Sequence, residues 1–216
     1  MASGLMQMFY PPKCILCGRL LSKEETDLCH TCRENVPEFA KGKFNISFVA
    51  RWTALWYYKE NVRESLLRYK FGRRRHYGAA YGRLLAMHLL QAGFDDFDLL
   101  TWVPISFRRW WKRGFNQVAV IARSCAKELG CKARPALKKI RHNPPQSTLN
   151  DAAMRRANVL GVYRVSKPSL VVGQQILLLD DIITTGATLS ECAKTLHFAG
   201  AAKVVCAAVA VSEHKK

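Results

Sequence analysis

A short segment near the C-terminus restricts the fold of this chain more than any other part of the sequence. An apolar run, Ile176–Leu179, leads into two adjacent acidic residues, Asp180 and Asp181. Two apolar residues and the small, hydroxyl-rich segment Thr184–Thr188 (TTGAT) follow. Apolar residues then recur with helical spacing over Ala187–Ala199. A buried strand that turns directly into a helix is typical of a parallel α/β sheet.

The rest of the chain repeats this alternation of strands and helices. We expect strands within Ile46–Tyr58, Asp98–Ile105, Cys131–Arg141, Val159–Val165, Val171–Leu179 and Lys203–Val211. We expect helices over Val62–Tyr69, Tyr77–Ala92 and Gln117–Leu129, and loops over Ser106–Asn116 and His142–Arg156. Because near-continuous apolar strands are buried on both faces, the sequence predicts an α/β fold with a mainly parallel sheet and helices on both faces.

Size and hydropathy narrow the class of protein. A chain of 216 residues that is 49% hydrophobic and 23% charged can bury the core of one domain and carry a small appendage. Its longest wholly apolar run, Val204–Val211, is far shorter than the roughly 18 residues of a membrane-spanning helix. The N-terminus also lacks the order of regions found in a signal peptide. We therefore expect a cytoplasmic protein that is not an integral membrane protein.

The chain is strongly basic. Lys and Arg number 34 against 16 Asp and Glu, a formal net charge of +18. Within Thr101–Asn150 there are 11 Lys and Arg and a single acid, Glu128. Such an excess predicts attraction to polyanions, which include nucleic acids, phosphorylated metabolites and anionic membranes. The alternative is a solvated basic surface without a partner.

Four of the eight cysteines form two CxxC pairs at the N-terminus. Cys14 and Cys17 are separated by eleven residues from Cys29 and Cys32. Two such pairs bring four sulfurs to a tetrahedral Zn²⁺ site, and a site filled by four cysteines is structural. The alternative is two redox dithiols. We assign the zinc ribbon to residues 1–36 and the larger domain to residues 46–216. The remaining cysteines are expected to be buried thiols: Cys125, Cys131, Cys192 and Cys206.

The segment after the two acids has the composition of a phosphate-binding turn. Backbone N–H groups at the start of a helix, together with the helix dipole, attract an anion. Threonine hydroxyls add donors, and Gly186 lets the backbone approach a ligand. Asp180 and Asp181 suit sugar hydroxyls or a hydrated Mg²⁺, so a ribose 5-phosphate would satisfy the whole segment. A plain helix start with one capping residue is the alternative.

The segment DDIITTGAT resembles the 5-phosphoribosyl 1-diphosphate (PRPP) fingerprint of type I phosphoribosyltransferases. Three further segments and the CxxC pairs resemble the ComF/GntX family, which includes proteins required for natural transformation. These segments are YKENVRESLLRYKFGRR (Tyr58–Arg74), VPISFRRWWKRGFNQ (Val103–Gln117) and PPQSTLNDAAMRRANVLGVY (Pro144–Tyr163). The resemblance implies a type I phosphoribosyltransferase-like fold with an N-terminal four-cysteine zinc ribbon.

The resemblance also implies site residues. It places Asp180 and Asp181, as the catalytic residues, at the ribose hydroxyls, and implies Mg²⁺ bound with PRPP. The expected PRPP contacts are Asp180, Asp181, Ile182, Thr184, Thr185, Gly186, Ala187 and Thr188. The expected pyrophosphate contacts are Pro104, Ile105 and Arg113, although Arg113 on a plain surface loop is the alternative. Gln146, Ser147 and Arg156 match the family's mobile catalytic loop.

Two clusters mix basic and aromatic residues, as single-stranded nucleic-acid sites do. The first combines Arg68, Lys70, Arg73, Arg74 and Arg75 with Tyr69, Phe71 and Tyr77. The second combines Arg108 and Arg109 with Trp110, Trp111 and Phe115. The alternative is surface arginines beside core aromatics.

Two main hypotheses for function follow. The first is a Mg²⁺-dependent transfer of phosphoribosyl to an acceptor recognised by Ile46–Arg75, linked to DNA uptake. The acceptor is open between a base, ammonia and a group on a nucleic acid end. The second is a non-catalytic protein that binds single-stranded DNA with the same scaffold, with DNA-uptake proteins as possible partners. A structural zinc module for the uptake machinery is a third, weaker alternative.

Overall fold

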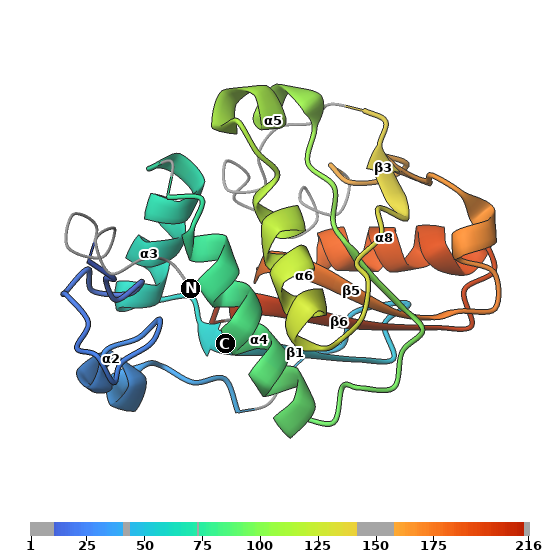
Figure 1. The fold of residues 1–216 in the computed structure, drawn as a ribbon. Coiled ribbons are helices and arrows are strands. Elements are labelled where there is room, and N and C mark those ends of the chain that lie inside the picture. The colour runs from blue at the N-terminus through green and yellow to red at the C-terminus, as the bar shows by residue number, and fades with distance from the viewer. Residues whose placement is uncertain (1–10, 41–43, 73, 142–157, 214–216) are drawn as a thin grey trace.

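The central sheet has four parallel strands in the order β1-β6-β5-β2 (Figure 1). The structure is a computed structural model that describes residues 11–40, 44–72, 74–141 and 158–213. The strands are β1 (Arg51–Tyr57), β2 (Leu99–Trp102), β5 (Gln175–Ile183) and β6 (Lys203–Val211). The two central strands, β5 and β6, are almost wholly buried, which explains their continuous apolar sequences.

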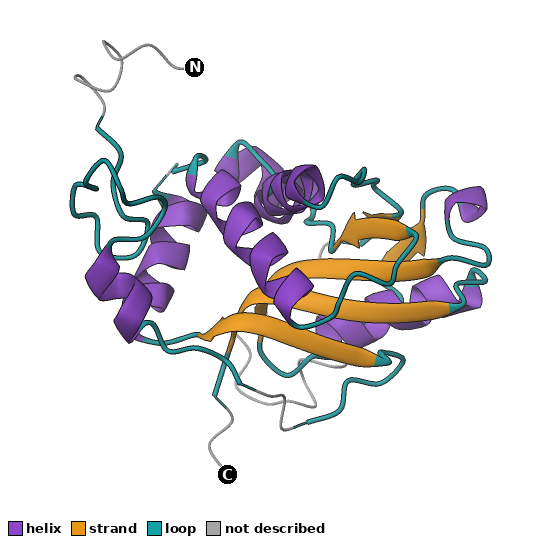
Figure 2. Cartoon of the chain, turned by 60° about the horizontal axis from the view of Figure 1, so that its bottom comes forward, coloured by secondary structure: helices purple, strands orange, loops and turns teal. Residues whose placement is uncertain are grey.

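Successive side chains of the central strands enter two separate cores. Leu177 and Leu179 pack with residues of α4 (Tyr77–Gln91) and α6 (Gln117–Glu128). Ile176 and Leu178, which point the other way, pack with residues of α8 (Ala187–Phe198). Figure 2 shows the resulting layers, with helices on both sides of the sheet. The expected mainly parallel α/β sheet with helices on both faces is therefore confirmed.

A small antiparallel ribbon and a short 3-10 helix complete the larger unit. The ribbon consists of β3 (Leu137–Lys139) and β4 (Tyr163–Val165), which lie inside the strands expected over Cys131–Arg141 and Val159–Val165. The 3-10 helix η2 (Pro168–Leu170) precedes β5. β5 begins and ends four residues later than the expected Val171–Leu179, because its pairing with β6 continues through Asp180 to Ile183. The two acids therefore lie within the strand.

The segment expected as a basic loop, Ser106–Asn116, contains a helix instead. This helix, α5 (Phe107–Arg113), begins after Ser106, whose hydroxyl accepts from the N–H of Arg109. It ends at Gly114, which has the left-handed φ of +76° that glycine favours after a helix. Both capping residues are visible in the sequence, but the aromatic and basic composition between them suggested a loop. α5 has no buried residue.

The cysteine-rich N-terminal segment packs on α3 (Glu60–Phe71) and includes one short helix, α2 (His30–Asn35). Ile15 and Leu16, between the first two cysteines, are buried in the same core as α3 and α4. Ser65 and Arg68 of α3 donate hydrogen bonds to the carbonyl oxygens of Ile15 and Leu16, respectively. Among the described residues, no helix combines the length and apolar character that crossing a bilayer requires.

Two glycines let α4 and α6 approach each other closely. A Cβ added at Gly82 would meet the Ile121 carbonyl oxygen at 2.7 Å as well as the side chain of Ser124. One added at Gly78 would meet the Val120 side chain at 2.6 Å. Because α4 and α6 together cover one face of the sheet, the distance between the two helices affects the position of α6.

We expect Gly82→Val to lower the free energy of unfolding by about 1–3 kcal/mol, because the added side chain overpacks the α4–α6 contact. Urea unfolding followed by circular dichroism measures the change. Leu90→Val is the matched control, since it places the same side chain on an exposed position of the same helix. A loss in Gly82→Val no larger than that in Leu90→Val would contradict the importance of the close approach.

Candidate functional site

A cleft of about 410 Å³ lies at the carboxyl ends of β2 and β5, where ligands of parallel α/β sheets bind. The loop after β2 and the end of β5 both contribute to its lining. Nine residues predicted from the sequence line it: Pro104, Ile105, Arg109, Arg113, Asp180, Asp181, Ile182, Thr184 and Thr188. Residues from distant parts of the chain thus meet in one cavity of the size that holds a small ligand.

Other predicted residues lie elsewhere. Thr185, Gly186 and Ala187 belong to the turn but do not line the cleft. Gly186 has a φ of +73°, and a Cβ there would meet the side chain of Ile46 at 2.8 Å. The backbone conformation and the packing therefore favour glycine here without any ligand. Arg74, Arg75 and Arg108 are exposed outside the cleft. Arg73, Gln146, Ser147 and Arg156 lie outside the described residues, and their roles stay predictions.

The two adjacent acids have different partners. Asp181 is held by two side chains: Lys70 Nζ lies 3.0 Å from its Oδ1, and Gln117 Nε2 donates to its Oδ2 at 3.0 Å. Asp180 accepts from the backbone N–H of Asp181 at 2.8 Å. Both acids are buried, with 9% and 6% of Asp180 and Asp181 exposed.

These surroundings separate the pKa values of the two carboxyls. Burial and the neighbouring charge of Asp181 raise the pKa of Asp180 to about 8. Burial alone would raise the pKa of Asp181 too, but the charge of Lys70 and the hydrogen bond from Gln117 lower it overall. Burial thus favours the protonated form of Asp180, whereas Lys70 and Gln117 favour the ionised form of Asp181.

Besides Lys70, four basic residues line the cleft: Arg109, Lys112, Arg113 and Lys139. Burial lowers the pKa of Arg109, of Arg113 and of Lys139, the last to about 8. Arg113 also lies over the ring of Phe71, with 5.4 Å from its Cζ to the ring centroid. Cations held at a desolvated wall favour an anionic ligand, because the charge of the ligand offsets the cost of their desolvation.

Part of this site was not predicted from the sequence. Gln117, Lys139, Tyr163 and Tyr58 line the cleft without having been singled out, and Lys70 was grouped with the basic and aromatic cluster. Helical spacing identifies Lys70, since it follows the buried Leu66 by four residues and so lies on the same face of α3. Nothing in the local pattern identifies Lys139 or Tyr163, because the pairing of β3 with β4 is what brings them together.

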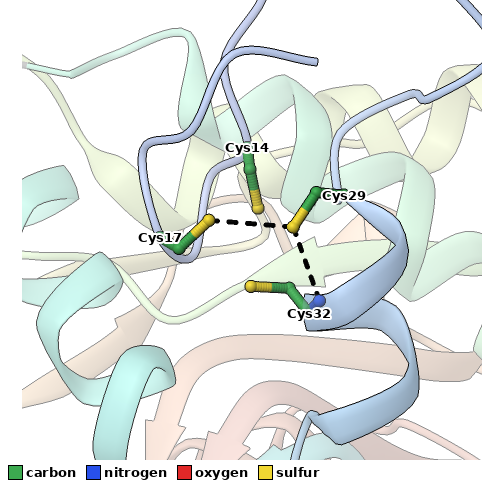
Figure 3. Close-up of side chains that lie close together, drawn as sticks. All are labelled: Cys14, Cys17, Cys29 and Cys32. Carbon is green, nitrogen blue, oxygen red and sulfur yellow. Dashed lines mark hydrogen bonds between the residues drawn. The ribbon is translucent and has the colours of Figure 1, made fainter. Parts of the chain in front are cut away.

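The four N-terminal cysteines form a compact cluster in which the side chains point toward one another (Figure 3). Their four sulfurs lie within 4.8 Å of one another. Cys17 Sγ and Cys29 Sγ are 3.7 Å apart, close to the roughly 3.8 Å edge of a tetrahedron with Zn–S bonds of about 2.3 Å. The backbone N–H of Cys32 donates to Cys29 Sγ. The donor set fits structural Zn²⁺.

The scattered cysteines mostly behave as expected. Cys125, Cys192 and Cys206 are buried, whereas Cys131 is partly exposed. Burial raises the pKa of Cys125, Cys192 and Cys206, which keeps these thiols protonated.

Comparison with protein families matches both parts of the chain. A model described as a phosphoribosyl transferase domain matches residues 118–216, which include β5, the two acids and the threonine-rich turn. This match covers 99 of the 216 residues, just under half of the chain. A second model, described as a double zinc ribbon domain, matches residues 5–44, which include the four-cysteine cluster. The type I phosphoribosyltransferase fold and the N-terminal zinc ribbon expected from the sequence are thus confirmed.

Several curated proteins are similar to this chain in sequence. The chain is 36% identical over 140 residues to the DNA utilization protein YhgH of Salmonella typhimurium, and the match covers 62% of this chain and 60% of the relative. It is 24% identical to Competence protein F of Haemophilus influenzae, across 92% of this chain and 96% of that protein. Competence protein ComFC of Streptococcus pneumoniae is 26% identical, across 89% and 96%. The match to the YhgH proteins spans about 60% of their length.

Solved structures give a weaker similarity. The glutamine PRPP amidotransferase from B. subtilis in complex with ADP and GMP is 22% identical, with a TM-score of 0.44. The match covers 65% of this chain and 30% of that one.

We expect Cys32→Ser to lower the zinc content and the unfolding temperature together, because a structural zinc site contributes directly to folding. Atomic absorption and thermal unfolding measure the two quantities. Cys125→Ser is the control, since it alters a buried thiol of α6 away from the cluster and should leave zinc bound. A Cys32→Ser protein with unchanged zinc content would contradict the four-cysteine site.

Proposed function

We propose that this protein binds PRPP in the cleft and transfers its phosphoribosyl group to an acceptor, in a process linked to DNA uptake. One observation carries the proposal: the acids of β5, the threonine-rich turn and the loop after β2 line a single cleft whose other walls include cations. The zinc ribbon, which we assign to residues 1–36, and the domain over residues 46–216 would act as one unit, because they share a core.

In this proposal each wall of the cleft meets one part of PRPP. Asp180 and Asp181 accept from the ribose hydroxyls. The turn Thr184–Thr188 and the start of α8 bind the 5-phosphate, with Thr184 and Thr188 lining the cleft. Pro104, Ile105 and Arg113, which line the same cleft, meet the pyrophosphate. Gln146, Ser147 and Arg156 belong to the proposed mobile loop.

The proposed reaction is a displacement at C1 of the ribose. The acceptor's lone pair forms a bond to C1 while the bond from C1 to the pyrophosphate oxygen breaks, and pyrophosphate leaves with the electron pair. The transition state resembles an oxocarbenium ion, so the cleft contributes by orienting the reactants and by stabilising charge. Arg113 and its cationic neighbours stabilise the negative charge that develops on the leaving group.

The donors present fit Mg²⁺, which the proposed substrate requires. Carboxylate oxygens are ligands that Mg²⁺ prefers, and Asp180 and Asp181 provide them beside the expected ribose. Next to them, Gln117 Oε1 is a buried oxygen that has no hydrogen-bond partner among the described residues. When bound with the substrate, Mg²⁺ would neutralise charge on the pyrophosphate.

The segment expected to recognise the acceptor forms another wall. From Ile46–Arg75, the residues Tyr58, Leu67, Lys70 and Phe71 line the cleft. These aromatic and apolar side chains do not distinguish between a base, ammonia and a group on a nucleic acid end as the acceptor. The proposal places the protein in the cytoplasm, where reduced cysteines bind zinc without forming disulfides.

A non-catalytic role in binding single-stranded DNA is the second candidate, and α5 favours it. On this helix 75% of Phe107, 44% of Trp110 and 74% of Trp111 are exposed. The rings of Phe107 and Trp110 stack at 5.8 Å, and the exposed Arg108 lies between them in the sequence. Exposed rings beside cations suit bases and phosphates. By contrast, Tyr69, Tyr77 and Phe115 are buried and are not available for stacking.

We expect Asp181→Asn to weaken PRPP binding by roughly tenfold or more, because a charge-assisted hydrogen bond to the ribose is lost. Calorimetry with Mg²⁺ measures the affinity, and pyrophosphate release with a panel of free bases, ammonia and single-stranded DNA measures turnover. Asp96→Asn, which alters an exposed acid paired with Lys203, is the control. Zinc content should not change in either variant.

Unaltered PRPP affinity in Asp181→Asn would contradict the role of the acids. PRPP binding without pyrophosphate release across the whole panel would favour the non-catalytic alternative.

We expect Trp111→Ala to weaken binding of single-stranded DNA by about 5- to 100-fold, since a stacked base contributes roughly 1–3 kcal/mol. Fluorescence anisotropy over a range of salt concentrations measures the effect, and phosphate contacts predict that affinity falls as salt rises. Phe198→Ala is the matched control, because Phe198 is 78% exposed on α8. Equal affinities for Trp111→Ala and the wild type would exclude α5 as the DNA surface.

A further inference from the structure

The cleft contains a cation that is paired with the carboxylate expected to bind ribose. Lys70 Nζ lies 3.0 Å from Asp181 Oδ1, with 14% of the lysine side chain and 9% of the aspartate side chain exposed. The other oxygen of Asp181 accepts from Gln117. A ribose hydroxyl that donates to Asp181 therefore meets a carboxylate whose charge Lys70 already neutralises.

We propose that Lys70 is a specificity-determining residue that exchanges ion-pair partners when PRPP binds. In the structure its ammonium group pairs with Asp181. In the complex the ammonium group moves to the pyrophosphate, and a ribose hydroxyl takes its place on Asp181. One ion pair breaks, another forms, and no covalent bond changes. This inference rests on the proposed function.

The position of Lys70 suits such an exchange. It lies in the last turn of α3, and its ammonium group carries three donors on a flexible four-carbon stem. Among the residues that the structure describes, Asp181 is its one ion-pair partner. Lys70 lines the same cleft as Pro104, Ile105 and Arg113, which are the proposed pyrophosphate contacts. In the proposed exchange, rotation of the lysine side chain carries the ammonium group to the pyrophosphate.

Gln117 keeps Asp181 in place while the lysine moves. Its Nε2 continues to donate to Oδ2, and its own backbone oxygen accepts from the hydroxyl of Tyr69, which neighbours Lys70 on α3. Gln117 is itself only 4% exposed, so it has little freedom to turn away. The carboxylate is thus oriented independently of Lys70.

The exchange gives selectivity for the diphosphate. PRPP offers the displaced ammonium group a new anionic partner at C1. Ribose 5-phosphate has the same 2- and 3-hydroxyls and the same 5-phosphate, but only a neutral hydroxyl at C1. Binding of ribose 5-phosphate at Asp181 leaves a mostly buried ammonium group without a counter-ion, which is costly. Lys70 therefore strengthens PRPP binding and weakens ribose 5-phosphate binding.

Calorimetry on the full chain with Mg²⁺ tests this, with PRPP and ribose 5-phosphate as the two probes. In Lys70→Met we expect PRPP affinity to fall about 10- to 100-fold, as for the loss of a charge-assisted hydrogen bond. The affinity for ribose 5-phosphate should stay the same or rise, so the ratio of the two affinities should collapse. Lys70→Arg should keep most of this ratio.

Lys59→Met is the matched control. Lys59 precedes the same helix and forms an exposed ion pair with Glu213 away from the cleft, so the ratio should not change. Lys70→Gln provides a second neutral variant, and thermal unfolding monitors both. Failure of both neutral variants to fold would show that the ion pair serves stability, and would overturn the proposal.

The outcomes separate this inference from the proposed function. Equal losses for both ligands in Lys70→Met, or no loss for PRPP, would overturn the exchange while leaving PRPP binding intact. A wild-type protein that binds neither ligand would overturn the proposed function itself, and the exchange with it.

Discussion

Helix α3 is the physical link on which the arrangement of this protein depends. Ser65 and Arg68 donate to the carbonyl oxygens of the first cysteine knuckle, while Lys70, less than two turns further along, pairs with Asp181. Tyr69, between them, donates to the backbone oxygen of Gln117, which in turn holds Asp181. A helix is stiff over this length, so the position of the knuckle and the position of the acids are fixed relative to each other. The zinc ribbon thus supports the cleft although none of its four cysteines lines it.

Burial of charge defines the chemistry of the cleft. Two adjacent carboxyls in one desolvated strand cannot both ionise without a counter-charge, and Lys70 provides it for Asp181. The cleft is also lined by Arg113 and Lys139, whose pKa values burial lowers, which means that these cations are held with less solvation than they prefer. Such a cleft is complementary to a ligand that carries both hydroxyls and phosphates, because the acids accept from hydroxyls and the cations attract phosphates.

The sequence predicted the parallel sheet and the four-cysteine cluster because each rests on a local pattern. The apolar runs of β5 and β6 and the CxxC spacing are local, and so are the acids before the threonine-rich turn. The residues that line the cleft were harder to predict, since Lys139 and Tyr163 are brought together only by the pairing of β3 with β4. α5 was taken for a loop because its aromatic residues lack a buried face, although Ser106 and Gly114 mark its ends.

The basic cluster of the sequence shows why proximity along a chain is a poor guide to a common role. Arg68 and Lys70 are two positions apart on a helix, and at about 100° per residue their side chains leave opposite sides. One contacts the zinc knuckle and the other enters the cleft. Arg74 and Arg75, past the end of the helix, remain in solvent. A cluster that looks like one polyanion site therefore divides between support of the fold, the ligand cleft and the surface. Among its described residues, only Arg74 and Arg75 are exposed in a position to attract a nucleic acid from a distance.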